Sequence, residues 1–120
     1  MFERADVVSL NCALNEATEG MVDADALSRL GPDGYLINTS RGELVVGADL
    51  IAALEEGRLA GAALDVFETE PLPEDSPLTD MDHAILGSHN AQNTEAAVAR
   101  VHDRTVANLI EGLTGERPEL

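Results

Sequence analysis

The chain has 120 residues, enough for one small domain with a buried core, and its single cysteine excludes an internal disulfide and every C-x-x-C pattern. Asp and Glu number 23 against 7 basic residues, and the formal net charge is -16. Such a surface repels phosphate backbones and anionic membranes, so we expect neither nucleic acid nor a membrane as a partner.

The composition also bears on the compartment. Residues 1–6 include acids where a signal peptide is basic, and no apolar run reaches membrane-spanning length, so we expect a soluble, cytoplasmic protein. All the basic residues are arginine, and an acidic, lysine-free chain is typical of a salt-rich, halophilic cytoplasm. There, roughly 1 M salt shortens the Debye length to about 3 Å. A GC-rich genome that favours Arg over Lys is the alternative explanation.

The first part of the chain alternates between strand and helix patterns. Residues 5–10 hold an apolar, β-branched run that predicts a strand buried on both faces. Residues 15–34 are helical in pattern, with Asp23 as a helix cap. Residues 35–39 predict a second buried strand, which a tight turn at residues 40–42 follows.

The middle of the chain repeats this alternation. A helix is predicted over about residues 48–56, because Leu50, Ile51 and Leu54 would share one face, and Gly57 would end it. A third strand is predicted over residues 62–66. Strands that alternate with helices at short spacing require crossover connections, so the sequence predicts a parallel sheet of the α/β class.

The last part of the chain breaks the pattern. Residues 67–82 hold three prolines among acids and predict an extended loop before a fourth strand at residues 84–88. Residues 94–113 then predict a long helix, with an apolar stripe that runs from Val98 through Val101 and Leu109 to Leu113.

Chemically active side chains follow the predicted strands. Arg41 follows the second strand, Asp65 and Glu70 follow the third, and His89 follows the fourth. The carboxyl ends of parallel strands meet at one sheet edge, where ligands bind. An arginine fork suits a substrate carboxylate, a histidine passes protons near neutral pH, and a carboxylate behind it fixes its tautomer. Singly, each residue is more simply a solvated polar group; jointly, they favour a site.

Three stretches carry a resemblance: Ile-Asn-Thr-Ser-Arg-Gly-Glu at 37–43, Gly-Ala-Ala-Leu-Asp-Val-Phe-Glu-Thr-Glu-Pro at 61–71, and Leu-Gly-Ser-His-Asn at 86–90. Together they resemble the NAD-dependent D-isomer-specific 2-hydroxyacid dehydrogenases, and the wording of residues 90–94 leans toward the phosphoglycerate-dehydrogenase-like members. The resemblance implies a partial Rossmann-like sheet of about four strands with flanking helices and a long C-terminal helix. It also implies an oxidoreductase that transfers hydride between nicotinamide and C2 of a small 2-hydroxy or 2-oxo acid. The implied cofactor is NAD, with NADP as the alternative.

The same resemblance assigns roles to residues. Arg41 would hold the substrate carboxylate and carbonyl, His89 would be the acid/base, and Glu70 would orient His89. Asp65 would meet the nicotinamide carboxamide. The implied cofactor-binding residues as a whole are Cys12, Thr39, Ser40, Arg41, Asp65, His89, Asn90 and Ala91. The histidines show no zinc spacing, so no metal site is expected.

One departure from the family pattern is an absence. No two of the ten glycines are spaced as G-x-G, the turn that holds a dinucleotide pyrophosphate. We therefore expect residues 1–120 to be a single domain, namely the second half of an NAD-binding domain ending in a long helix, without the glycine-rich half and the substrate domain.

Two hypotheses follow from this absence. In the first, the chain is an enzyme fragment that acts together with a missing half. In the second, it is a non-catalytic truncated module that folds and self-associates, through the strand edge at residues 7–10 or the stripe on residues 94–113. The expected protein partner is another copy of the chain, in a homo-oligomer, or a complementary chain.

Overall fold

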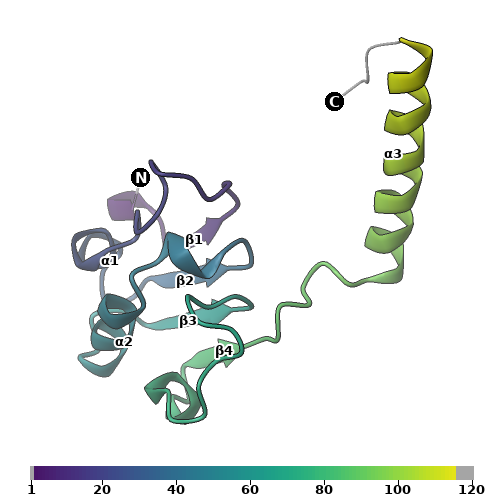
Figure 1. Ribbon diagram of the computed structural model, residues 1–120. Helices are drawn as coiled ribbons and strands as arrows, with labels where there is room; N and C mark the ends of the chain where they lie inside the picture. Colours follow the sequence, from purple (N-terminus) through teal and green to yellow (C-terminus); the bar gives the residue numbers. More distant parts are fainter. Residues whose placement is uncertain (1, 116–120) are drawn as a thin grey trace. The chain divides into compact units, whose positions relative to one another are not determined.

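The computed structural model of the chain describes residues 2–115, which form two compact units (Figure 1). The first unit ends at His89, and the second begins at Asn90. The first unit is an α/β sheet domain, and the second is built on one long helix.

The first unit is organised on a four-stranded parallel sheet. Its strands lie side by side in chain order: β1 (Val7–Leu10), β2 (Tyr35–Asn38), β3 (Gly61–Leu64) and β4 (Ala84–Leu86). This arrangement confirms the predicted parallel sheet of about four strands. Because all strands run the same way, residues 11, 39, 65 and 87, which follow them, come out at one edge of the sheet.

Two helices cover one face of this sheet, and Figure 1 shows them on the same side. Helix α1 (Ala24–Leu30) begins at Asp23, whose side chain accepts a hydrogen bond from the Ala26 N–H, so the predicted cap is confirmed. It is shorter than the helical pattern because residues 15–20 form turns instead. Helix α2 (Gly47–Glu55) matches its prediction within one residue at each end. Short 3-10 helices occupy Phe2–Arg4, Gly42–Leu44 and Pro77–Asp80.

The core lies between the helices and the covered face of the sheet. Side chains from both layers are buried there, including Val8, Leu10, Leu27, Leu36, Leu50, Leu54 and Leu64. The opposite face carries Val7, Tyr35 and Ile85, whose exposed fractions are 52%, 51% and 73%. The prediction that the first strand is buried on both faces is therefore wrong for this chain. Its alternate residues, Val7 and Ser9, face away from both helices and are exposed.

The second unit contains helix α3 (Glu95–Thr114). Thr94 caps it by accepting a hydrogen bond from the Ala97 N–H, so the predicted long helix is confirmed and begins one residue later. No residue of α3 is buried, and Val101, Leu109 and Leu113 are among its exposed apolar side chains. Between residues 2 and 115, no helix has both the length and the apolar content to cross a bilayer.

Candidate functional site at the strand ends

Hydrogen bonds join the carboxyl ends of the four strands into one platform. The Ser40 hydroxyl donates to the Leu10 carbonyl at 2.7 Å, which ties the turn after β2 to the end of β1. The Asp65 N–H donates to the Asn38 carbonyl at 2.9 Å, and the His89 N–H donates to the Asp65 carbonyl at 2.8 Å. The side chains predicted to act together therefore start from a fixed backbone.

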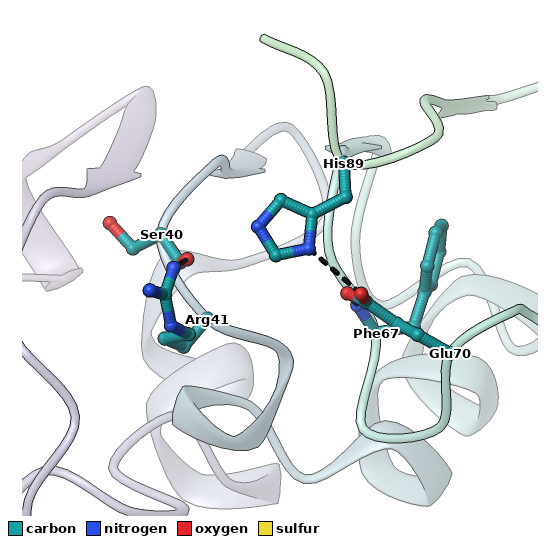
Figure 2. Close-up of polar contacts among 5 residues, drawn as sticks. All are labelled: Ser40, Arg41, Phe67, Glu70 and His89. Atoms are coloured by element: carbon teal, nitrogen blue, oxygen red, sulfur yellow. Dashed lines mark hydrogen bonds and ion pairs between the residues drawn. The ribbon is translucent and has the colours of Figure 1, made fainter. Parts of the chain in front are cut away.

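Glu70 and His89 form a pair across this platform. One carboxylate oxygen of Glu70 lies 2.8 Å from His89 Nδ1, and the other accepts a hydrogen bond from the Phe67 N–H at 3.0 Å (Figure 2). The bond to His89, and secondly that from Phe67, lower the pKa of Glu70 below its ordinary value, and nearby Arg41 lowers it further. Glu70 is thus held as an anion beside the imidazole. The structure brings together the acid/base residue and the orienting residue that the resemblance implied.

The pair also fixes the orientation of the imidazole. Because a carboxylate only accepts hydrogen bonds, Nδ1 of His89 carries a hydrogen and Nε2 is the nitrogen that can exchange a proton with a ligand. Figure 2 shows this second nitrogen turned away from Glu70, toward the side on which Arg41 lies. The His89 backbone has a φ of 57°, in the left-handed region that side chains rarely adopt. Such strained positions cluster at functional sites.

Arg41 stands on the turn after β2 and is exposed. The guanidinium nitrogen Nη1 donates to the carbonyl of Ser40 at 2.7 Å, which holds the guanidinium group against the turn that carries it. The guanidinium has five N–H donors, so further donors are available to an anion. Arg41 therefore supplies a positive charge near the Glu70–His89 pair, where a carboxylate ligand can bind.

Two clefts open beside these residues. One, with a volume of about 510 Å³, is lined by Cys12, Ala13, Leu14, Thr39, Ser40 and Arg41. The other, of about 290 Å³, is lined by Phe67, Glu70, Pro71, Leu72, Gly87, Ser88 and His89. The first cleft gathers four of the residues predicted to border a cofactor. The second contains the Glu70–His89 pair.

The remaining predicted residues lie at the same edge or just beyond it. Asp65 is buried, and its carboxylate packs so closely on Gly87 that a Cβ added there would overlap Asp65 Oδ1. Asn90 and Ala91 follow His89 directly and open the second unit, where the Asn90 carbonyl accepts a hydrogen bond from the Asn93 N–H at 2.9 Å. The roles assigned to all these residues stay predictions.

Sequence reasoning missed three contributors to the site: the Asn38 side chain, Gly42 and the backbone N–H of Phe67. Asn38 is only 1% exposed and bonds to both sides of the turn that carries Arg41. An Asn that ends an apolar strand just before a tight turn could have indicated this role, because Asn side chains bond their own nearby backbone.

Across the residues that the structure describes, no group of three or more His, Cys, Asp or Glu could hold a metal ion.

A parallel sheet covered by helices, with polar side chains at the carboxyl ends of its strands, is the architecture of nucleotide-binding α/β domains. The family model described as D-isomer specific 2-hydroxyacid dehydrogenase, NAD binding domain, matches residues 1–91. The chain belongs to the D-isomer specific 2-hydroxyacid dehydrogenase family.

Individual relatives agree with this assignment. A glyoxylate reductase from Thermofilum pendens is 42% identical over 98% of this chain, which spans 35% of that relative's length. The solved structure of a D-isomer specific 2-hydroxyacid dehydrogenase from Xanthobacter autotrophicus, in complex with NADPH and MES, is 35% identical with a TM-score of 0.87, covering 97% of this chain and 47% of that one. The NAD-complexed enzyme from Lactobacillus delbrueckii is 30% identical with a TM-score of 0.83, covering 98% and 40%.

Proposed function

We propose that this chain carries the nicotinamide-side half of a cofactor domain and the acid/base residues of a 2-hydroxyacid dehydrogenase. The observation that supports the proposal most is the Glu70–His89 pair, which shares an edge of the parallel sheet with Arg41. Each group has a separate task in the interconversion of a 2-oxo acid and a 2-hydroxy acid.

Arg41 binds the substrate through its carboxylate, and its remaining donors polarise the C2 carbonyl. His89 holds a proton on Nε2 and donates it to the C2 oxygen during reduction; in the reverse direction it takes that proton back. Glu70 stays anionic and accepts the Nδ1 hydrogen, which fixes the tautomer of the imidazole and keeps Nε2 facing the substrate.

The residues at the strand ends suit the nicotinamide end of NAD or NADP. The open cleft beside Cys12, Thr39 and Ser40 lies at the carboxyl ends of β1 and β2, where parallel sheets bind nucleotides. Asp65 would meet the carboxamide, and the backbone around Cys12 would border the cofactor. Hydride exchange with C2 of the substrate is the chemistry that a bound nicotinamide would supply.

The substrate class that we propose is a small 2-oxo acid such as glyoxylate, which one similar protein is named for reducing. The chain spans about a third of the length of that relative. Turnover therefore requires protein segments equivalent to the remainder, including a pyrophosphate-binding turn. We further propose that the protein works in a salt-rich cytoplasm, since an uncompensated charge of -16 repels both the cofactor and the substrate.

The test is a calorimetric titration of NADH into the chain at high salt, with Asp65→Ala as the variant. We expect binding that weakens in Asp65→Ala. Asp33→Ala is the matched control, because this exposed aspartate lies in the turn before β2 and should leave the affinity unchanged. Circular dichroism of each variant checks that the fold persists. Absence of NADH binding by the folded wild-type chain would contradict the proposal that this half of the domain retains a cofactor site.

A second candidate function is a non-catalytic module that self-associates. The observation that favours it is helix α3, which exposes Val101, Leu109 and Leu113 and buries no residue. Size-exclusion chromatography with light scattering, at low and high salt, distinguishes the two candidates when it is combined with the NADH titration. A dimer or larger assembly without NADH binding would favour the module, whereas a monomer in both buffers would contradict it.

A further inference from the structure

We propose that Asn38 and Gly42 are positioning residues that hold Arg41 at a fixed separation from the Glu70–His89 pair. The catalytic meaning of this inference rests on the proposed function, but its structural content concerns the chain without any ligand. The contacts that carry the inference join the turn after β2 to the loop after β3. These two segments are too far apart in the sequence for a local sequence motif to reveal the contacts.

Asn38 fixes the turn that carries Arg41. Its side-chain amide donates to the Arg41 carbonyl at 2.8 Å, and its side-chain oxygen accepts from the Ser40 N–H at 3.1 Å. Its own carbonyl accepts from the Asp65 N–H at 2.9 Å, which anchors it to the end of β3. At 1% exposure, the side chain has no solvent to replace these partners, so losing either bond is costly. The turn is therefore built around one buried amide.

Gly42 joins this turn to the loop that carries Glu70. The residue is buried, and a Cβ added to it would overlap the carbonyl carbon and oxygen of Phe67. Backbone atoms cannot swing aside as a flexible side chain can, so any other residue at position 42 pushes the Phe67 peptide away. The same Phe67 residue donates its N–H to Glu70 Oε1 at 3.0 Å, directly below the carboxylate that holds His89 (Figure 2).

The path from Arg41 to His89 thus has few steps. A peptide bond joins Arg41 to Gly42, tight packing joins Gly42 to Phe67, and one hydrogen bond joins Phe67 to Glu70. The Glu70–His89 bond completes it. A substrate held by Arg41 must present its C2 oxygen to His89, and displacing catalytic groups by about 1 Å is enough to cost about a hundredfold in rate. Because Gly42 lacks a side chain, the turn that carries Arg41 can pack against Phe67, and this packing sets the separation between Arg41 and His89.

The experiment compares Gly42→Ala with Gly61→Ala in the free chain. Gly61 is a matched control: it is buried in the same unit, and its added Cβ would lie 2.7 Å from a backbone oxygen, that of His83. Both variants should lose stability, but only Gly42→Ala should release Glu70. We expect NMR to show a Glu70 carboxyl that titrates closer to the ordinary pKa of glutamate, and a Phe67 amide that exchanges about tenfold faster.

Two outcomes would overturn the inference. One is a folded Gly42→Ala chain whose Glu70 titration and Phe67 exchange match the wild type, and the other is a Gly61→Ala chain that shifts Glu70 equally. If Gly42→Ala does not fold, Asn38→Ala makes the test without added bulk: it should loosen the turn and speed Phe67 exchange, and unchanged exchange would refute the coupling. These measurements need no cofactor or substrate. The coupling can therefore be refuted while NADH still binds, and NADH binding can be absent while the coupling is observed.

Discussion

The two units use their apolar side chains in opposite ways. In the first unit, leucines from the sheet and from both helices meet in one core, and Leu27, Leu36 and Leu44 are completely buried. Helix α3 is longer than α1 or α2 and has a comparable stripe of valines and leucines, yet none of its residues is buried. Sequence periodicity is similar in both places. The difference teaches that an amphipathic pattern predicts a helix but does not reveal what the apolar stripe packs against.

The largest expected effect is a loss of stability in the first unit. Leu36→Ala removes a fully buried side chain and should lower the free energy of unfolding by about 2–5 kcal/mol. Leu109→Ala removes the same atoms from a site that is 61% exposed and should cost less than about 0.5 kcal/mol. Urea unfolding followed by fluorescence of Tyr35, the only tyrosine, reports on the sheet. Equal losses in the two variants would contradict the contrast.

A smaller effect is expected for a substitution that destabilises only the second unit. Thr94→Ala removes the cap of α3 and should destabilise this helix by about 1 kcal/mol, whereas Thr94→Ser should retain most of the cap. Carbon chemical shifts of residues 95–98 measure the fraying. The urea midpoint seen by Tyr35 should not move. A shift of that midpoint in Thr94→Ala alone would show that the two units unfold together.

The smallest effect concerns the charge pair at the end of the first unit. The pKa of Glu70 is lowered in the folded chain, so the pair contributes stability above the ordinary glutamate pKa and loses it as pH falls through the folded value. Glu70→Gln should therefore be less stable than the wild type at pH 7, with the difference vanishing in acid. Urea midpoints across pH measure it, with exposed Glu43→Gln as the control. A difference that persists at low pH would contradict this assignment.

The sequence predicted the strands of the parallel sheet because each strand is a short apolar run with clear ends. It also predicted the Glu70–His89 contact, through wording that resembles a known family. It did not predict the exposed face of β1, since Val7 and Val8 are chemically alike and only the position of the helices distinguishes them. The packing of Gly42 on Phe67 was equally invisible, because a glycine carries no side chain from which a tertiary contact could be inferred.

The φ of 57° at His89 has a consequence for evolution and engineering. Glycine adopts this conformation without penalty, while a residue with a side chain pays about 1–2 kcal/mol, so His89→Gly should be more stable than His89→Ala. A library selected only for heat resistance would tend to replace this histidine with glycine, whereas under the proposed function a library selected for turnover would retain it. Under that proposal, backbone stability and chemistry make opposite demands on the residue at position 89.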